Sequence, residues 1–463
     1  MQLSRISHAR ATLKGGLRLF AVAAATLALV GCAGSTNGGT TAEPTAPPGV
    51  PQPPVNLESY ECSVEVPCVI SFRWWGGDDR QQRTLDAIAL FEEQNPHIRV
   101  NPLPVSFAGY YEQLAIEFVA GTGPDVFQID AARPTEFGRQ GLLLPLDGMV
   151  DTTYLPAAQV EEASVNGVLY AAPHTGNAQS LLINADLFAE AGVPLPDDDT
   201  WTWDDFVRIG GELRDNLPAG QYALELIPAN MVRAWLAQQY QGGLFGADGD
   251  IAAPPELVAE FFDFTNQLVQ EGITPAPAVT QQYLLAGLSE SLVGTNRAAM
   301  IFWPSNAIGQ LVAASEADIR LVRLPGESSE TYVGTNVDVG LYYAASANTH
   351  YPEAAGRFIN FLVNSPEAGL YFGVERGIPL NSQVAAALAP TVDAVAQQQF
   401  DYLDRVFAAN GFAYPRAPGG DLHVFINRAF EGVIFGQLSS QAGADQFIAD
   451  IQEGIDHARH GIE

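Results

Sequence analysis

The order of secondary structure between residues 69 and 130 constrains the fold of this chain more than any other feature. Three short runs, rich in β-branched and aromatic residues or alternating with period two, are predicted strands: 69–75, 98–100 and 125–130. Two stretches between them carry apolar side chains at helical spacing: 81–93 and 110–119. Strands that alternate with helices predict an α/β sheet with crossover connections.

The rest of the chain continues in the same style. Thr202-Trp203-Asp204-Asp205 is typical of a capping box that opens a helix, and further helices are predicted at 255–271, 352–364 and 440–459. A length of 463 residues predicts two or three domains at about 150 residues each.

The charge balance excludes one large class of function. The chain has 22 Lys and Arg residues against 53 Asp and Glu residues, which gives a formal net charge of -31. Protein surfaces that bind nucleic acid need a basic face to contact the phosphates, so nucleic acid is not an expected partner. The hydrophobic fraction of 47% is sufficient for a buried core.

The first 31 residues have the architecture of an export signal. Arg5, Arg10, Lys14 and Arg18 precede an apolar run over 19–30, and no acidic residue interrupts this part of the chain. The apolar run is shorter than the roughly 20 residues that a membrane span needs. We therefore expect residues 1–31 to be a signal peptide, in preference to a transmembrane anchor.

The signal ends in Leu29-Val30-Gly31-Cys32, which resembles the cleavage site of bacterial lipoproteins. That resemblance implies cleavage before Cys32, attachment of lipid such as palmitate to its thiol, and anchoring to the outer face of the cell membrane. A chance cysteine in an ordinary signal peptide is the alternative. Cleavage would remove four basic residues, including Lys14, the only lysine, and would change the net charge from -31 to -35.

Residues 32–57 follow the signal and are rich in Gly, Thr and Pro. Such a segment has too few large apolar side chains to fold by burying them. We expect it to be a partly extended tether between the membrane and the folded chain.

Cys62 and Cys68 remain as an even pair once Cys32 is set aside. An even pair in an exported chain predicts a disulfide that holds the start of the folded part. A metal-binding pair is the alternative, but no His or Cys partner stands nearby in the sequence.

The usual sequence signatures of enzymes are missing. The chain has no HExxH, GxSxG, P-loop or GxGxxG pattern. His457 and His460 stand three apart near the C-terminus, where a solvated pair is a better interpretation than a metal site. Among 53 acidic residues a pair of carboxylates for glycoside hydrolysis can always be selected, so such a pair carries no weight. The sequence predicts neither an enzyme nor a metal or cofactor site.

Tryptophans indicate where a ligand could bind. Trp75 ends the first predicted strand before a Gly-Gly-Asp-Asp turn, and open α/β sheets bind ligands at the carboxyl ends of their strands. Neighbours on a strand point to opposite faces, so one of Trp74 and Trp75 is expected in the core. An aromatic face beside Asp, Asn or His suits a sugar. Trp201 and Trp203 are expected to be packing residues.

A series of short motifs runs in order from about residue 69 to residue 384. They are Trp74–Asp78, Phe91–Val100, Ala120–Val126, Gly141–Leu146, Asn166-Gly167 before Pro173, Leu182–Asn184 before Ala191–Pro194, Arg297–Met300 before Trp303, Glu353–Ala355 before Phe358–Leu362, and Gly377–Pro379. At these spacings the chain resembles the extracellular solute-binding proteins of bacterial ABC importers, the family that includes maltose- and oligosaccharide-binding lipoproteins.

The resemblance implies an α/β fold that is periplasmic-binding-protein-like, of type II, with two α/β lobes, a hinge and a ligand cleft. By position, lobe one would hold 58–173 plus 297–335, and lobe two would hold 178–296 plus 336–463. The hinge would be crossed more than once, and the lobes would close on a ligand between them.

Carried over by position, the resemblance also implies a set of ligand-binding residues. They are Trp75, Asp78, Gln128, Asp130, His174, Asn177, Asn230, Trp235, Trp303, Arg376 and His423. The chain departs from the maltose-binding branch at His174–Asn177 and at His423, so the identity of the sugar does not carry over.

The function implied is that of a monomeric, lipid-anchored binding protein. It is expected to capture a carbohydrate of the oligosaccharide class and to deliver it to the permease subunits of an ABC importer. Three alternatives stay open. The same fold could bind a polyol phosphate or an organic cation, although an anionic ligand would need an arginine such as Arg133 or Arg376 near the cleft. The chain could also be a secreted carbohydrate-active enzyme or a purely structural surface lipoprotein.

Overall fold

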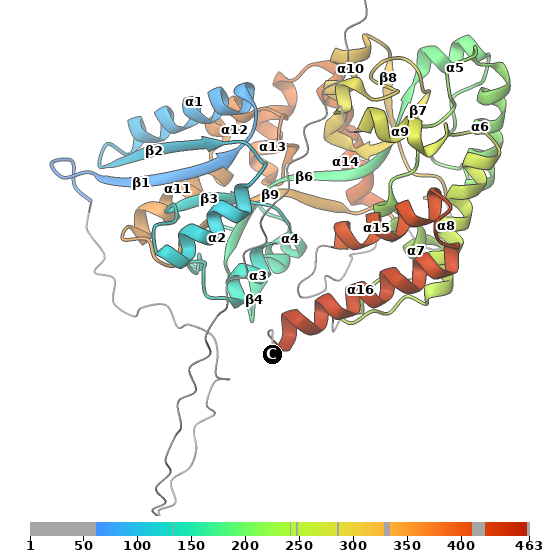
Figure 1. Cartoon of the computed structure of the whole chain (residues 1–463). Coiled ribbons are helices and arrows are strands. Elements are labelled where there is room, and N and C mark those ends of the chain that lie inside the picture. Colours follow the sequence, from blue (N-terminus) through green and yellow to red (C-terminus); the bar gives the residue numbers. More distant parts are fainter. Residues whose placement is uncertain are drawn as a thin grey trace, which may run out of the picture. The chain divides into compact units, whose positions relative to one another are not determined.

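The computed structural model describes residues 62–460, apart from 132, 241, 247–248, 285–286, 328–333 and 410–421 (Figure 1). The strands are β1 (Cys68–Trp75), β2 (Ile98–Val105), β3 (Val126–Ile129), β4 (Ser164–Val165), β5 (Val168–Leu169), β6 (Ala171–Asn184), β7 (Met300–Pro304), β8 (Ile319–Val322), β9 (Val337–Ala345) and β10 (Ile378–Pro379). The signal peptide 1–31, the tether 32–57 and the lipid-attachment residue Cys32 lie outside the described residues.

The α-helices are α1 (Asp78–Gln94), α2 (Tyr110–Ala120), α3 (Arg133–Arg139), α4 (Ala157–Glu162), α5 (Ala185–Ala191), α6 (Trp203–Asn216), α7 (Val232–Tyr240), α8 (Pro255–Gln270), α9 (Pro277–Leu284), α10 (Ile308–Ser315), α11 (Pro352–Asn364), α12 (Pro366–Phe372), α13 (Ser382–Leu388), α14 (Ala394–Ala409), α15 (Leu422–Ile434) and α16 (Ser440–His460). Single 3-10 turns are η1 (Ala229–Met231), η2 (Leu288–Glu290), η3 (Ser305–Ala307) and η4 (Ala389–Thr391). None of the helices within the described ranges is long and apolar enough to cross a membrane.

The predicted alternation of strand and helix at the start of the chain is confirmed by β1, α1, β2, α2 and β3. Helix α1 ends where the sequence indicates, because the backbone N–H and the side-chain amide of Asn95 both donate to the carbonyl of Phe91, at 2.8 and 2.9 Å. The capping box of α6 is also confirmed, with Thr202 and Asp205 bonded reciprocally.

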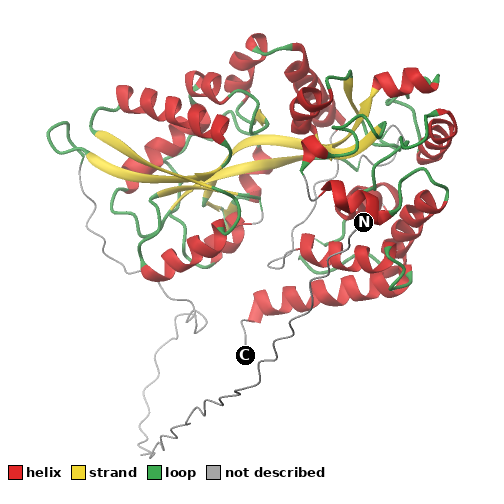
Figure 2. Cartoon of the chain, turned by 45° about the horizontal axis from the view of Figure 1, so that its top comes forward, coloured by secondary structure: helices red, strands yellow, loops and turns green. Residues whose placement is uncertain are grey.

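The main sheet has the strand order β10-β6-β9-β3-β1-β2. Strand β1 runs parallel to β2 and β3, whereas β9 is antiparallel to both β3 and β6. Helices α1 and α2 are the crossovers, and they lie on opposite faces of the sheet in both views (Figures 1 and 2).

The two faces of β1 follow from its alternating side chains. Ile70, Phe72 and Trp74 are fully buried on the face covered by α1 and α11, where the Phe72 ring lies 5.2 Å from that of Phe358. Arg73 points to the other face and pairs with Glu117 of α2 at 2.6 Å. Trp74 is therefore the core member of the tryptophan pair, as expected for neighbours on a strand.

Strand β6 belongs to both hydrophobic cores of the chain. Its residues 171–178 pair with β9, and its residues 179–184 pair with β7 and β8. In the second stretch Leu182 joins the first core, while Leu181 and Ile183 join the second. Helices α5–α8, α15 and α16 build the second core, in which α16 packs along α8 and α15.

The cores divide the chain differently from the lobe boundaries that the resemblance implied. Strand β9 and helices α11–α14, expected in lobe two within 336–463, contribute their apolar residues to the first core. The reason is that β9 inserts between β3 and β6, which returns the chain to the first core. The stretch 297–335, expected in lobe one, is split, with Met300, Phe302 and Leu324 in the second core.

Helix α14 ties the elements of the first core to those of β6, β8 and the second core. Its Leu403 is buried in the first core. Tyr402 is buried in the same core, and its hydroxyl donates to the carbonyl of Gln179 in β6 at 2.6 Å, while Arg405 pairs with Asp198 at 2.9 Å. Helix α14 therefore lies against β6, the strand that joins the cores, and is hydrogen-bonded to it.

The start of the folded chain contains a disulfide between Cys62 and Cys68, with their Cα atoms 5.1 Å apart. The bond closes a short loop directly before β1. It therefore holds the first strand to the segment that follows the predicted tether.

Two glycines, Gly340 and Gly377, pack against β6 where this strand passes from the first core to the second; this part of β6 is called the crossover between the cores. Gly377 has a φ of 111°, and a Cβ built on it would lie 2.6 Å from Oδ1 of Asn177 and 2.7 Å from the carbonyl of Gly176. Gly340 of β9 meets the same Asn177 side chain, at 2.6 Å from Nδ2. Both positions therefore leave room for the Asn177 amide and for no side chain of their own.

Replacing Gly377 by alanine is expected to lower the free energy of unfolding by at least about 2 kcal/mol, because the added methyl meets backbone and is held at a disfavoured φ. Urea denaturation measures the change. The matched control is Gly309→Ala in α10, where a Cβ meets no atom within 4 Å. That control should be neutral or stabilising by about 0.5–1 kcal/mol. Equal effects of the two substitutions would contradict the role given to Gly377.

Candidate functional site

An aromatic platform lies at the carboxyl ends of β1 and β3, and it consists of Trp75, Phe107, Tyr110 and Tyr111. The ring of Trp75 lies 5.4 Å from that of Phe107, 4.9 Å from Tyr110 and 6.2 Å from Tyr111. Trp75 and Tyr111 are half-buried, and Phe107 is 57% exposed. The platform thus offers aromatic faces to solvent at the edge where α/β sheets bind ligands.

Polar groups surround the platform. The hydroxyl of Tyr110 donates to the carbonyl of Gln128 at 2.7 Å, and the hydroxyl of Tyr111 accepts from the backbone N–H of Asp130 at 2.9 Å. Burial raises the pKa of both tyrosines well above their ordinary value, so both phenols stay protonated. The guanidinium of Arg133 lies 4.7 Å from the Tyr111 ring and pairs with Glu136 at 2.6 Å.

This arrangement suits a ligand with apolar faces and hydroxyl groups. Aromatic faces pack against C–H groups, while fixed carboxylates and phenols exchange hydrogen bonds with hydroxyls. The predicted residues Trp75 and Asp130 are brought together here through Tyr111. The predicted Asp78 is exposed in the first turn of α1, directly after the Gly76-Gly77 turn that follows Trp75.

Three other predicted residues gather inside the first core rather than at its surface. Gln128, His174 and Arg376 are 0%, 3% and 3% exposed. The His174 ring lies 4.9 Å from that of Tyr343, and Tyr343 is paired in register with Gln128. The Gln128 amide, both His174 nitrogens and the Tyr343 hydroxyl have no hydrogen-bond partner among the described residues. This buried polar group lies on the α1 and α12 side of the sheet.

The charge state of the group follows from its burial. Burial, together with the positive charges of Arg376 and Arg80, lowers the pKa of His174 to about 3, so the imidazole is neutral at pH 7. Arg376 donates to the hydroxyl of Thr84 at 2.6 Å and lies over the Phe372 ring at 5.0 Å. The group therefore carries one cation, Arg376, beside uncharged donors and acceptors.

Asn177 lies at the crossover itself. It pairs in register with Asp338 of β9, and its amide fills the space between Gly340 and Gly377. Asp338 in turn lies 3.9 Å from Arg233 of α7, a helix of the second core. The Asn177 side chain is thus held by the strands that join the two cores.

The second core contributes Asn230 in η1 and Trp235 in α7. The half-buried ring of Trp235 lies 5.5 Å from Trp203 and 5.0 Å from Phe264. Within the described part of the chain, Nε1 of Trp235 and Oδ1 of Asn230 are buried without hydrogen-bond partners. Trp201 and Trp203 pack as expected, with their indole N–H groups bonded to the Arg323 carbonyl and to Gln238.

The last two predicted residues are Trp303 and His423. Trp303 is half-buried in β7 and pairs in register with Ser180 of β6. His423 falls in the first turn of α15, and its side chain lies outside the described residues. The ligand role of each predicted residue stays a prediction.

Sequence reasoning missed Phe107, Tyr110 and Tyr111 of the platform. Their signal was a cluster of aromatic residues at the start of a helix that follows a strand, which is the position where crossovers present side chains at a sheet edge. No group of three or more His, Cys, Asp or Glu side chains in the described ranges could hold a metal ion.

A two-core α/β fold with an aromatic platform at its strand ends is an arrangement suited to binding a small molecule. Residues 78–368 match the family described as "Bacterial extracellular solute-binding protein", which is more than half of the chain. The chain therefore belongs to this family of extracellular solute-binding proteins.

Three proteins similar to this chain, two of them with solved structures, are named for binding a sugar or were solved with one. A galactooligosaccharide-binding protein of Bacillus subtilis is 24% identical over 327 residues, which are 67% of this chain and 73% of the relative. A periplasmic oligogalacturonide-binding protein of Yersinia enterocolitica, solved with saturated digalacturonic acid, is 22% identical with a TM-score of 0.72, covering 84% of this chain and 99% of that one. An ABC substrate-binding protein of Listeria monocytogenes, solved with cycloalternan, is 20% identical with a TM-score of 0.70, covering 84% and 98%. The predicted fold class is confirmed.

A buried acid in the second core was not expected from the sequence. Glu225 is 1% exposed, and its backbone N–H donates to the carbonyl of Met300. Neither carboxyl oxygen has a hydrogen bond of good geometry to a described residue. Burial raises the pKa of Glu225, and the backbone of Val293 and Leu292 offsets only part of that rise, so the pKa is about 7.

The raised pKa predicts a pH-dependent stability. Below about pH 4.5 Glu225 is protonated in both states, and its contribution is fully present. As the pH rises to about 7 the unfolded state releases the proton first, so the free energy of unfolding falls by up to about 3 kcal/mol. Glu225→Gln should remove this slope in urea denaturation at pH 5 and 8. Glu260→Gln, on the exposed face of α8, should retain it, and a slope unchanged in Glu225→Gln would contradict the assignment.

Proposed function

We propose that this protein is the lipid-anchored, extracellular binding component of an ABC importer, that it captures an oligosaccharide by hinge closure, and that it delivers the sugar to a permease as a monomer. Membership of the solute-binding family supports the importer role. Relatives named for galactooligosaccharide and oligogalacturonide binding support the class of ligand.

The aromatic platform is the observation that carries the proposal. Trp75 and Tyr111 present half-buried rings, and Asp130 stands beside them at the same strand end. A sugar ring would pack on the indole face, and its hydroxyls would meet the carboxylate and the phenols. Two further predicted contacts, Asn230 and Trp235, would approach from the second core on closure.

The charges near the platform argue against a polyol phosphate as the ligand. Arg133 is paired with Glu136, and Arg376 is buried inside the first core. Neither arginine offers an open guanidinium to a phosphate, which prefers bidentate contact. Lobe closure needs a ligand that binds the closed state better, so contacts from both cores are required for a population shift.

Calorimetric titration with galactooligosaccharides, oligogalacturonides and cycloalternan tests the proposal. At least one of these saccharides should bind, and Trp75→Ala should weaken that binding about tenfold to a hundredfold, because the substitution removes the stacking face. The matched control is Trp201→Phe, since Trp201 is buried outside the platform and is 3% exposed. That variant should bind the saccharide as the wild type does.

Two outcomes would contradict the proposed ligand and site. A flat response to a broad panel of sugars would remove carbohydrate as the ligand. Wild-type affinity in Trp75→Ala would remove the platform as the binding site. Release of shortened sugars during the titration would support the carbohydrate-active enzyme instead.

The lipid anchor is tested through Cys32. In a bacterial host, Cys32→Ala should move the protein from the membrane fraction to the supernatant and abolish labelling by a palmitate analogue, because no thiol remains for the lipid at the cleavage site. The control is Ser35→Ala, three residues away in the predicted tether, which should stay in the membrane fraction. Membrane retention and labelling of Cys32→Ala would disprove the anchor while leaving sugar binding untouched.

A further inference from the structure

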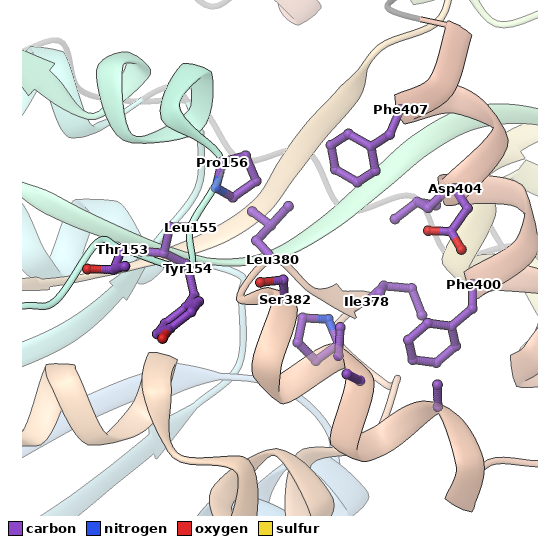
Figure 3. A pocket seen from close by; sticks show the side chains of 15 residues that line it. Thr153, Tyr154, Leu155, Pro156, Ile378, Leu380, Ser382, Phe400, Asp404 and Phe407 are labelled. Atoms are coloured by element: carbon purple, nitrogen blue, oxygen red, sulfur yellow. The ribbon is translucent and has the colours of Figure 1, made fainter.

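A pocket of about 600 Å³ lies beside the crossover, away from the aromatic platform (Figure 3). Its walls come from the loop before α4, from β10, from α13 and η4, and from α14. The lining residues include Tyr154, Leu380, Phe400, Leu403, Asp404 and Phe407. None of them belongs to the predicted ligand contacts.

Backbone hydrogen bonds hold the walls of this pocket in place. The N–H of Ser382 donates to the carbonyl of Tyr154 at 3.0 Å, which joins α13 to the loop before α4. The N–H of Leu380 donates to the carbonyl of His174 in β6 at 2.9 Å. The pocket is therefore preformed, and a ligand would not have to order its walls.

The floor of the pocket is apolar and its rim is aromatic. Leu380, Phe400 and Leu403 are 5%, 7% and 1% exposed, whereas Tyr154 and Phe407 are 43% and 45% exposed. Large apolar side chains exposed on both sides of a concave surface are typical of ligand sites rather than of plain surface. The body of a ligand that fits here is consequently apolar.

Asp404 supplies the charge of the pocket. It is the one charged residue in the described lining, and its carboxylate makes no hydrogen bond or ion pair with any residue that the structure describes. Arg405, its neighbour, is engaged by Asp198 and Asp199. In Figure 3 the side chains of Phe400, Asp404 and Phe407 leave the same side of α14.

We propose that this pocket binds a small organic monocation, with an apolar body on the floor of Leu380, Phe400 and Leu403 and an ammonium head beside Asp404 and the ring of Phe407. An ammonium group is attracted both by a carboxylate and by an aromatic face. An anion would meet no basic side chain in the described lining, and a sugar would meet few hydrogen-bonding groups. The site is separate from the proposed saccharide site.

Titration with three molecules of one shape tests the charge preference. The probes are phenethylammonium, phenethyl alcohol and 3-phenylpropanoate, measured by ligand-observed NMR and calorimetry on the purified chain. Phenethylammonium should bind most tightly and 3-phenylpropanoate most weakly. Asp404→Asn should weaken phenethylammonium binding about fivefold, as expected for a partly exposed ion pair, and should leave phenethyl alcohol unaffected.

The matched control is Asp401→Asn, one turn earlier on α14, whose carboxylate accepts from Gln397 outside the pocket. It should bind phenethylammonium as the wild type does, and Phe407→Ala should weaken both the cation and the alcohol. Equal affinity for the three probes, or equal losses in Asp404→Asn and Asp401→Asn, would overturn the proposal. Displacement of phenethylammonium by a bound saccharide would also overturn it, because the cation would then occupy the saccharide site.

Discussion

The antiparallel pairing of β6 with β9 is the constraint on which the rest of the structure depends. It places β9 between β3 and β6, so one continuous set of backbone hydrogen bonds connects the first core to the strand that enters the second. Breaking such buried bonds would leave N–H and C=O groups unpaired, so the cores can move only by twisting the sheet. The register is irregular between Pro173 and Gly176, beside the closely packed Gly340 and Gly377, so the regular ladder is interrupted at this point.

Near this pairing of β6 with β9, several buried polar groups are left without hydrogen-bond partners among the described residues. Gln128, His174, Tyr343 and Arg376 bury unpaired polar atoms beneath the strand ends that carry the aromatic platform. Each such atom costs free energy that a purely apolar core would avoid. Natural chains retain such costs chiefly at functional sites. Helix α14 adds a second tie, because it buries Leu403 in the first core and bonds through Tyr402 to β6.

Local patterns were enough to predict the first five elements, the capping box at Thr202, and the burial of one member of the Trp74 and Trp75 pair. Their signals lie within a few residues of each other in sequence. The lobe boundaries could not be read in this way, because the return of β9 to the first core is a pairing across more than 150 residues of chain. Likewise, the ring of Tyr111 contacts that of Trp75 only after helix α1 has brought β2 beside β1. The burial of His174 depends on Phe372 and Tyr343, which are distant in sequence and pack on its ring.

The packing of α16 on α8 has a consequence for how the protein is made. Helix α8 precedes, by far more than a hundred residues of chain, the side chains that complete its buried face, such as Phe447 and Ile451 of α16. The second core therefore stays open until α16 has been synthesised. Until then α8 and α15 expose apolar side chains that α16 later covers, whereas the first core uses no described residue of α16.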